Sequence, residues 1–256
     1  MFSSEIIEIA EKSGKSERLK QIEYFIKEHE QFYIYKTDLS EELIGCKEPK
    51  KLFGYNAIRF IQLLLYRSKM LMIGSVKSLN SKTLLSSILS VRAHYETTGS
   101  IVFFRKRLSS YYNGNIEFDK LDDDLLRLSL GATTINLPEV PKPIQVLNLI
   151  DATDEYLKKN IFKDKMPDAK MFRSLYEDLC DFCHPNYQGT FSGHEIIGDG
   201  SVIFHDIDHI ADAEFSFFFN LTISAALFLY FYEEVLLLLK EKEIMPVFHK
   251  SPALTS

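Results

Sequence analysis

The sequence feature that most constrains the fold is an apolar stretch at residues 215–232, FSFFFNLTISAALFLYFY. Its length approaches the ~20 apolar residues that a helix needs to cross a lipid bilayer. However, Ser216, Asn220 and Thr222 interrupt it, and acidic residues flank it without a basic cluster at either end. These features are atypical of a membrane span, whereas a helix that is apolar on all sides is typical of the centre of a soluble bundle. We therefore expect a buried helix here rather than a membrane span.

Helical periodicity extends over most of the chain. Only 11 Gly and 8 Pro occur among 256 residues, which favours long uninterrupted helices over a turn-rich β-sandwich. The spacing of apolar residues predicts helices over residues 5–30, 55–75, 79–112, 119–130, 143–159, 169–183 and 211–242. Because composition does not shift enough to mark a linker, we expect one domain over residues 1–256, with the N-terminal helices of residues 1–50 at its periphery.

One segment departs from the helical pattern. Two short β-branched runs, Ile196-Ile197 and Val202-Ile203, flank a Gly-Asp-Gly sequence, and this arrangement predicts a β-hairpin near residues 195–205. The predicted fold class is therefore all-α: a multi-helix bundle that carries a small β-hairpin.

Charge and composition restrict the partners of the chain. Hydrophobic residues make up 46% and charged residues 26%, which is typical of a globular protein. The formal net charge of −6 argues against a broad cationic face for duplex nucleic acid, but leaves room for a local basic site. The first residues show neither a basic region nor a continuous apolar core, so we expect a cytoplasmic protein with reduced cysteines.

Two opposite charges fall on the apolar face of the helix predicted for residues 79–112. At ~100° per residue, Arg92 and Glu96 lie near the centre of a stripe that also contains Ile88 and Tyr95. Burying two ions costs several kcal/mol each unless they are paired and hydrogen-bonded. We expect this pair either to line a polar pocket or to form a structural ion pair with a neighbouring helix. His94 falls on the opposite side, which predicts a surface histidine.

The segment at residues 180–186, CDFCHPN, contains a Cys-x-x-Cys-His pattern. This pattern attaches c-type haem, and Cys-x-x-Cys can also provide half of a zinc site, here with His205 and His209 as the other half. Haem attachment follows export, for which the chain shows no signal. The interval to the two histidines exceeds the ~12–15 residues of a zinc finger, and helical spacing places Cys183 in an apolar stripe with Cys180 at its margin. We expect no metal or other cofactor.

His184 lies where this helix should end, because Pro185 disfavours helical geometry at the residue before it. The partial negative charge at a helix C-terminus favours the imidazolium form, so His184 is suited to exchange a proton near neutral pH. A purely structural alternative also fits. In that interpretation His184 caps carbonyl groups, Pro185 stops the helix, and Asn186 forms an Asx turn.

Three stretches resemble a widespread group of uncharacterised bacterial proteins with a helical fold akin to HEPN domains, the higher-eukaryote and prokaryote nucleotide-binding group. LSVRAHYETTGSIVFF is similar to the Arg-x-x-x-Glu helix of that group. VPKPIQVLNLIDATDEYL and LYEDLCDFCHPNYQGTF are similar to its VL-x-x-ID helix and its HPN segment. The resemblance covers residues 79–191, within a HEPN-like core expected at residues 79–243.

HEPN proteins are commonly metal-independent ribonucleases of toxin or phage-defence systems, and they usually act as dimers. The resemblance implies an RNA-directed protein in which His184 is the general acid/base and Arg92, Arg173 or Asn186 bind phosphate, with Glu96 beside Arg92. The family's Arg-x4-6-His motif has no counterpart here. Its absence and the acidic net charge favour the alternative, a non-catalytic interaction or sensor module with a protein partner. Convergence of His184 and Arg92 on one cavity would favour catalysis, whereas a His184 that faces only water would favour the structural interpretation.

Overall fold

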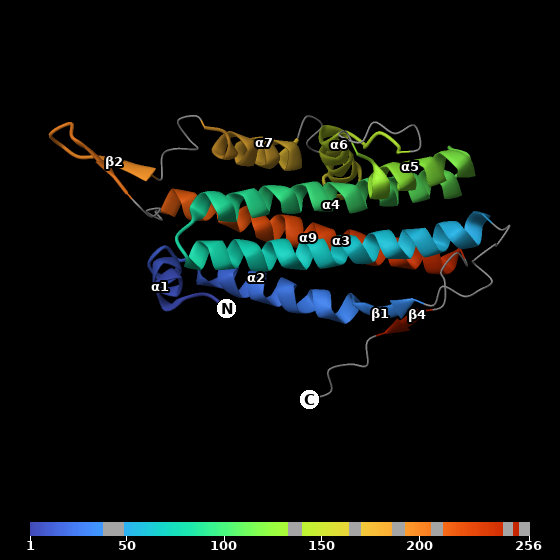
Figure 1. Ribbon diagram of the computed structural model, residues 1–256, viewed down its shortest axis with the longest axis horizontal. Coiled ribbons are helices and arrows are strands. Elements are labelled where there is room, and N and C mark those ends of the chain that lie inside the picture. The colour runs from blue at the N-terminus through green and yellow to red at the C-terminus, as the bar shows by residue number, and fades with distance from the viewer. Residues whose placement is uncertain are drawn as a thin grey trace.

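Three long helices run side by side through the length of the molecule (Figure 1). They are α3 (Pro49–Asn80), α4 (Leu84–Tyr112) and α9 (Asp212–Glu241). The computed structural model describes residues 1–37, 49–132, 140–163, 170–185, 193–205, 212–242 and 248–250. Within these ranges the fold is an all-α multi-helix bundle with a few short strands, which confirms the predicted fold class.

The helices predicted from apolar periodicity are all present, with altered ends. The segment at residues 5–30 divides at Gly14, whose positive φ of 69° allows a turn between α1 (Ser4–Lys12) and α2 (Ser16–Glu28). The helix predicted at residues 55–75 extends at both ends. It begins at Pro49, because the first turn of a helix tolerates a residue without a backbone N–H.

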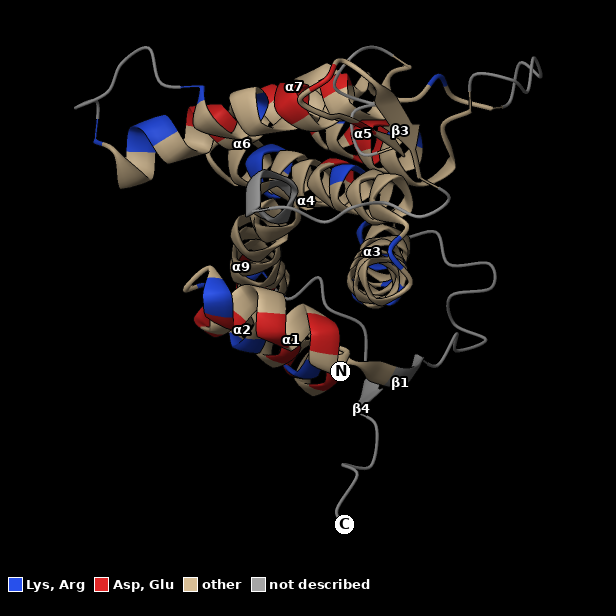
Figure 2. Cartoon of the chain, turned by 90° about the vertical axis from the view of Figure 1, so that its left-hand side faces the viewer, with Lys and Arg blue, Asp and Glu red and all other residues tan. Residues whose placement is uncertain are grey.

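A fourth helix completes the central bundle. α2 and the short 3₁₀ turn η1 (His29–Phe32) pack against α9 and α3, on the side away from α4 (Figure 2). The four helices therefore surround a common interior. α1 folds back beside α2 at one end of the bundle.

A second layer covers the outer side of α4 (Figure 1). It consists of α5 (Phe118–Leu130), α6 (Val146–Tyr156), which continues into a π-helical turn at Leu157–Ile161, and α7 (Met171–Cys183). Gly99 lets α6 approach closely, because a Cβ atom at this position would lie only 3.0 Å from the carbonyl carbon of Leu149. With this second layer on its outer side, and α3 and α9 on its inner side, α4 contacts other helices on two opposite sides.

Two groups of buried apolar side chains fill the bundle. One joins α1, α2 and α7 to the adjoining halves of the long helices, and the other joins α5 to their remaining halves. α9 contributes to both groups, for example through Phe218 and Phe228, which are fully buried. The apolar stretch predicted as a buried helix thus lies at the centre of the fold. Among the described residues one segment, Phe218–Glu241, is long and apolar enough to cross a membrane, and 44% of its most apolar 18-residue window is buried.

The predicted hairpin is confirmed. β2 (His194–Ile196) pairs antiparallel with β3 (Val202–Phe204), and His194 lies opposite Phe204. Gly200 adopts a positive φ of 83° in the turn, and the Asp199 carboxylate accepts a hydrogen bond from the Ser201 N–H at 2.8 Å. A second sheet was not predicted: β1 (Ile34–Thr37) pairs antiparallel with β4 (Phe248–Lys250).

Candidate functional site

Arg92 and Glu96 lie on the side of α4 that faces α7, and Tyr176 of α7 joins them. The Nε atom of Arg92 is 3.5 Å from Oε1 of Glu96. The Tyr176 hydroxyl donates to the same Glu96 oxygen at 3.0 Å, and the Arg92 guanidinium lies 5.7 Å from the centre of the Tyr176 ring. The Arg92 and Glu96 side chains are 32% and 28% exposed, so the pair is half-buried rather than deep in the interior. Arg92 and Glu96 form an ion pair within α4, and the Tyr176 hydroxyl connects it to α7, so the arrangement corresponds to the predicted structural ion pair.

Burial shifts the pKa values of the groups that surround the Arg92–Glu96 pair. Desolvation is the largest effect on Tyr176 and raises the pKa of its hydroxyl, which therefore remains a donor to Glu96. Desolvation by itself would lower the pKa of Arg92, but Tyr176, Cys180 and Glu96 together raise it. Desolvation also raises the pKa of Cys183, and the positive charge of the nearby Arg92 opposes this effect. The cluster thus holds one cation, one carboxylate and neutral groups, an arrangement suited to bracing two helices.

Arg173 lies at the opposite end of α7 from His184. Its side chain forms ion pairs with Glu177 at 2.6 Å and with Asp151 of α6 at 3.0 Å. A hydrogen bond with Glu177 raises the pKa of Arg173. Arg173 and His184 are eleven positions apart, which corresponds to ~16 Å along a helix axis. The structure therefore does not bring these two predicted site residues together.

A side chain of α6 fixes the position of the N-terminus of α7. Both oxygens of the Asp154 carboxylate accept hydrogen bonds from the first backbone N–H groups of α7, those of Phe172 at 2.8 Å and Arg173 at 2.9 Å. These N–H groups have no partner within a helix, so Asp154 caps α7 from another element. Tyr95 of α4 adds a packing contact, because its ring stacks on Phe172 at 4.4 Å between centres.

His184 terminates α7 as predicted. Its backbone is extended, with φ −82° and ψ 149°, and its N–H group donates to the carbonyl of Cys180 at 3.1 Å. The His184 side chain is exposed and makes no hydrogen bond or ion pair with any residue in the described ranges. Cys183, which precedes it, contacts Arg92, so the end of α7 adjoins the Arg92 cluster. Asn186 lies outside the described residues.

A buried chain of polar contacts crosses the bundle, and its residues were not predicted as a site. His29 and His94 both approach the Ser68 hydroxyl, with an Nε2 to Oγ distance of 2.7 Å for each ring. The His94 Nδ1 atom lies 2.8 Å from the Ser224 hydroxyl, which is 2.8 Å from that of Thr98. We call these five residues the buried histidine chain. It joins η1, α3, α4 and α9 at the level between the two apolar groups.

The prediction that His94 is a surface histidine was wrong. His94 is 0% exposed. The prediction assigned one buried face to the helix, but α4 packs α6 and α7 on one side and α3 and α9 on the other. A signal was present in the sequence. Ser87 and His94 are seven residues apart on α4, as are Ser68 and Ser75 on α3, and this spacing places small polar residues on one helical face.

His29 and His94, the two histidines of the buried histidine chain, are neutral at pH 7. Burial lowers the pKa of His29 to about 4, although its hydrogen bond to the Phe25 carbonyl partly opposes the shift. Burial, together with the smaller electrostatic effects of His29 and Arg67, lowers the pKa of His94 to about 3. Because the chain is buried, a substrate has no access to it. Its role is to satisfy polar groups and to set the register of four helices.

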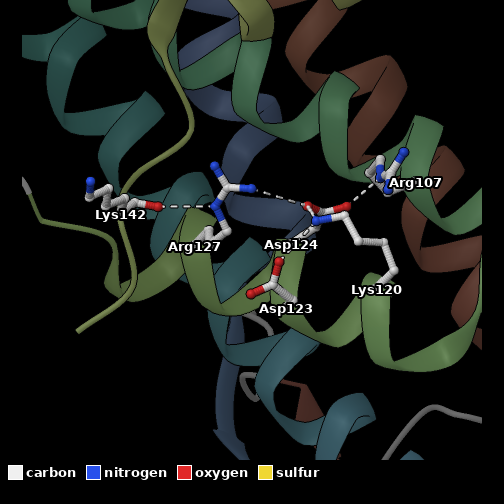
Figure 3. A network of polar contacts seen from close by, with 6 residues as sticks. All are labelled: Arg107, Lys120, Asp123, Asp124, Arg127 and Lys142. Carbon is white, nitrogen blue, oxygen red and sulfur yellow. Dashed lines mark hydrogen bonds and ion pairs between the residues drawn. The ribbon is translucent and has the colours of Figure 1, made fainter. Parts of the chain in front are cut away.

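A second buried charge network connects α4 to α5 (Figure 3). The Asp124 side chain is 4% exposed and lies 2.5 Å from Nε of Arg107 and 3.0 Å from Nζ of Lys120. Arg127 lies 3.9 Å from the same carboxylate and donates to the backbone carbonyl of Lys142 at 3.0 Å. These contacts connect α5 to α4 and to the segment before α6, so the network has a structural role in helix packing.

One face of α3 remains uncovered by the described elements. Leu63, Tyr66 and Met70 are 59%, 55% and 45% exposed. Their spacing of three and four residues places them in one column along the helix. Figure 2 shows α3 at the edge of the bundle, with one side turned away from α9 and α4. This column is the clearest candidate for a contact surface on the helical body.

Within the described ranges no group of three or more His, Cys, Asp or Glu residues is arranged to hold a metal ion. Cys180 and Cys183 are free thiols, and His209 lies outside the described residues. Comparison with protein-family models, with curated proteins and with solved structures finds no match to this chain.

Proposed function

We propose that this protein is a non-catalytic interaction module, built on a HEPN-like helical bundle, that binds a protein partner in the cytoplasm. The observation that supports the proposal is the uncovered column of Leu63, Tyr66 and Met70 on α3. Large apolar side chains that gather on one exposed face are typical of a binding surface. Tyr is also among the residues enriched where binding energy concentrates.

The state of the arginines supports the same choice. Arg92 is paired with Glu96, and Arg173 is paired with Asp151 and Glu177. A carboxylate beside each guanidinium competes with a phosphate for the same donors and repels it. An interaction module needs neither arginine free, whereas a ribonuclease of the predicted kind needs at least one.

Photo-crosslinking from the α3 face tests the proposal. A photoreactive phenylalanine analogue in place of Tyr66 is expected to crosslink the same protein repeatedly in the native cytoplasm. The matched control places the analogue at Tyr24 on α2, which is 56% exposed and has no comparable apolar column. Equal crosslinking from both positions, or none from position 66, would contradict an interaction through this face.

An RNA-directed ribonuclease of toxin or phage-defence type is the second candidate. It is favoured by one observation: His184 is exposed at the end of α7, directly after a cysteine that contacts Arg92. The test is cleavage of RNA by the purified protein and by His184→Ala. Equal activity in the two proteins, or none in either, removes this candidate. Sedimentation velocity of the same samples measures the homodimer that the resemblance implies.

A further inference from the structure

The uncovered column on α3 continues into a cation at each end. Arg59 precedes Leu63 by four residues, and Lys77 follows Met70 by seven, so both share the helical face of the column. Both side chains are exposed. The five residues Arg59, Leu63, Tyr66, Met70 and Lys77 form what we call the α3 strip. It is ~27 Å long at the rise of an α-helix.

The charge of α3 is unusual for this chain. Its 32 residues include six Lys and Arg and no Asp or Glu, although the whole chain has a net charge of −6. Several other cations of the bundle have carboxylate partners, as Lys69 has with Glu30 at 2.8 Å and Arg105 has with Glu234 at 3.0 Å. Within the described residues, Arg59 and Lys77 have no such partner. The strip is therefore an apolar centre between two positive charges that have no carboxylate partner in the described part of the chain.

This charge pattern argues against a second copy of the chain as the occupant. In an antiparallel two-fold contact centred between Tyr66 and Met70, Arg59 of one copy would lie near Lys77 of the other at both ends. A parallel arrangement would likewise place cation against cation. Like charges that meet across an interface oppose association. Any homo-oligomer should therefore use another face.

The apolar centre also argues against nucleic acid. Leu63 and Met70 offer no donor to a phosphate, and single-stranded nucleic acid usually needs cations along the whole path of its backbone. A helix with an apolar stripe fits better, since such helices dock through residues at i, i+3, i+4 and i+7. Acidic residues at the two ends of that helix would face Arg59 and Lys77.

We propose that the α3 strip binds an amphipathic α-helix of a protein partner, with an apolar stripe of about three turns and Asp or Glu at both ends. The inference deepens the proposed interaction function, on which it rests, by naming the class of partner. Apolar contact with Leu63, Tyr66 and Met70 contributes most of the affinity, and the terminal charges set orientation and partner choice.

The test uses three designed helical peptides and the full chain. The first has a Leu stripe with Glu at both ends, the second has the same stripe with Lys ends, and the third has the first composition in scrambled order. The variant R59E/K77E reverses both charges of the strip. The control K240E changes an exposed lysine on α9. Fluorescence anisotropy reports binding, and far-UV circular dichroism checks that each variant is folded.

We expect the Glu-ended peptide to bind the natural chain and K240E alike, and R59E/K77E at least about tenfold more weakly. The Lys-ended peptide should show the reverse preference and bind R59E/K77E best. A Met70→Glu variant should lose binding of the Glu-ended peptide. The absence of binding at about 1 mM peptide would overturn the proposal. Equal affinity of the natural chain and R59E/K77E for the Glu-ended peptide, or equal affinity of the natural chain for the ordered and scrambled peptides, would also overturn it.

Two further arms identify other occupants. Tighter binding of a single-stranded oligonucleotide or of anionic phospholipid vesicles than of the Glu-ended peptide, lost in R59E/K77E, would also overturn it. A specific crosslink from position 66 together with failure of the peptides would leave the interaction function in place and remove only the partner class. Charge-dependent peptide binding without any cellular crosslink would support the helix-binding preference of the α3 strip but contradict the proposed interaction function in the cell.

Discussion

His29 and His94 contact the same hydroxyl group, with the Ser68 oxygen 2.7 Å from the Nε2 atom of each ring. A hydroxyl has one proton, so it donates to one ring and accepts from the other. The Phe25 carbonyl, 2.6 Å from Nδ1 of His29, can only accept. His29 therefore carries its proton on Nδ1, and its bare Nε2 accepts from Ser68.

The donor and acceptor of each remaining hydrogen bond in the buried histidine chain follow from this assignment. Because Ser68 donates to His29, it accepts from Nε2–H of His94, whose Nδ1 accepts from the Ser224 hydroxyl. We predict opposite tautomers for the two neutral rings: Nδ1–H for His29 and Nε2–H for His94. Long-range ¹⁵N correlation NMR at pH 7 measures the tautomers directly. Finding both rings protonated on Nε2 would contradict the derived order.

Stability should fall on mild acidification. The folded pKa values of His29 and His94 are about 4 and about 3, below the ordinary value of 6.5. Below pH 6.5 the unfolded chain therefore binds more protons than the folded chain. Stability is lost as pH falls from 6.5 towards 4, by about 1.4 kcal/mol per pH unit for each histidine that titrates only when unfolded. Urea unfolding between pH 6.5 and 5 measures the slope before most carboxylates titrate.

The variant His29→Gln provides the control for this slope. Glutamine keeps a polar side chain but does not titrate, so the slope between pH 6.5 and 5 should fall by about one proton equivalent. His205 directly follows β3 and is not part of the buried histidine chain, so His205→Gln should leave most of the slope in place. An unchanged slope in His29→Gln would show that His29 does not remain neutral in the folded protein.

The two neighbouring aspartates of α5 should differ sharply in importance. Asp124→Asn removes the charge that three cations share at a side chain only 4% exposed, and should destabilise the fold by about 3 kcal/mol. Asp123→Asn removes only an exposed pair with Lys120, and should cost less than about 1 kcal/mol. Urea unfolding of both variants checks the order. Similar values would argue against the network in Figure 3.

Gly99 and Gly74 provide a matched test of helix packing. A Cβ at Gly99 meets the Leu149 backbone at 3.0 Å, whereas a Cβ at Gly74 meets only the Ser90 hydroxyl at 3.8 Å. Gly99→Ala should therefore push α6 from α4 and cost about 1–3 kcal/mol. Gly74→Ala should be neutral or stabilise α3 by up to about 1 kcal/mol, because alanine favours helix. Thermal unfolding measures both, and equal losses would contradict the close approach of α6.

Part of this protein could be predicted from local sequence. The helices follow from apolar periodicity, the hairpin from Gly-Asp-Gly between β-branched runs, and the end of α7 from Pro185. Each depends on residues close to one another in the chain. The strand pair β1–β4 was missed because its two strands lie more than 200 residues apart, and neither has a turn signal that points to the other.

The candidate site was less predictable for the same reason. Pairing of Arg92 with Glu96 follows from a four-residue helical spacing, but the contribution of Tyr176 depends on where α7 packs. Likewise, nothing near Arg173 in the sequence indicates that Asp151 of α6 would take up its charge.

The sequence by itself determined that the chain forms long helices with a central apolar member and one hairpin, because backbone preferences and apolar spacing act over a few residues. Only the tertiary structure decided which faces are buried. α4 lies between two layers, so His94 is enclosed and Arg92 is left at a margin. Burial depends on all the elements that surround a side chain, and a helix enclosed on two sides has no single apolar stripe from which its buried face can be predicted.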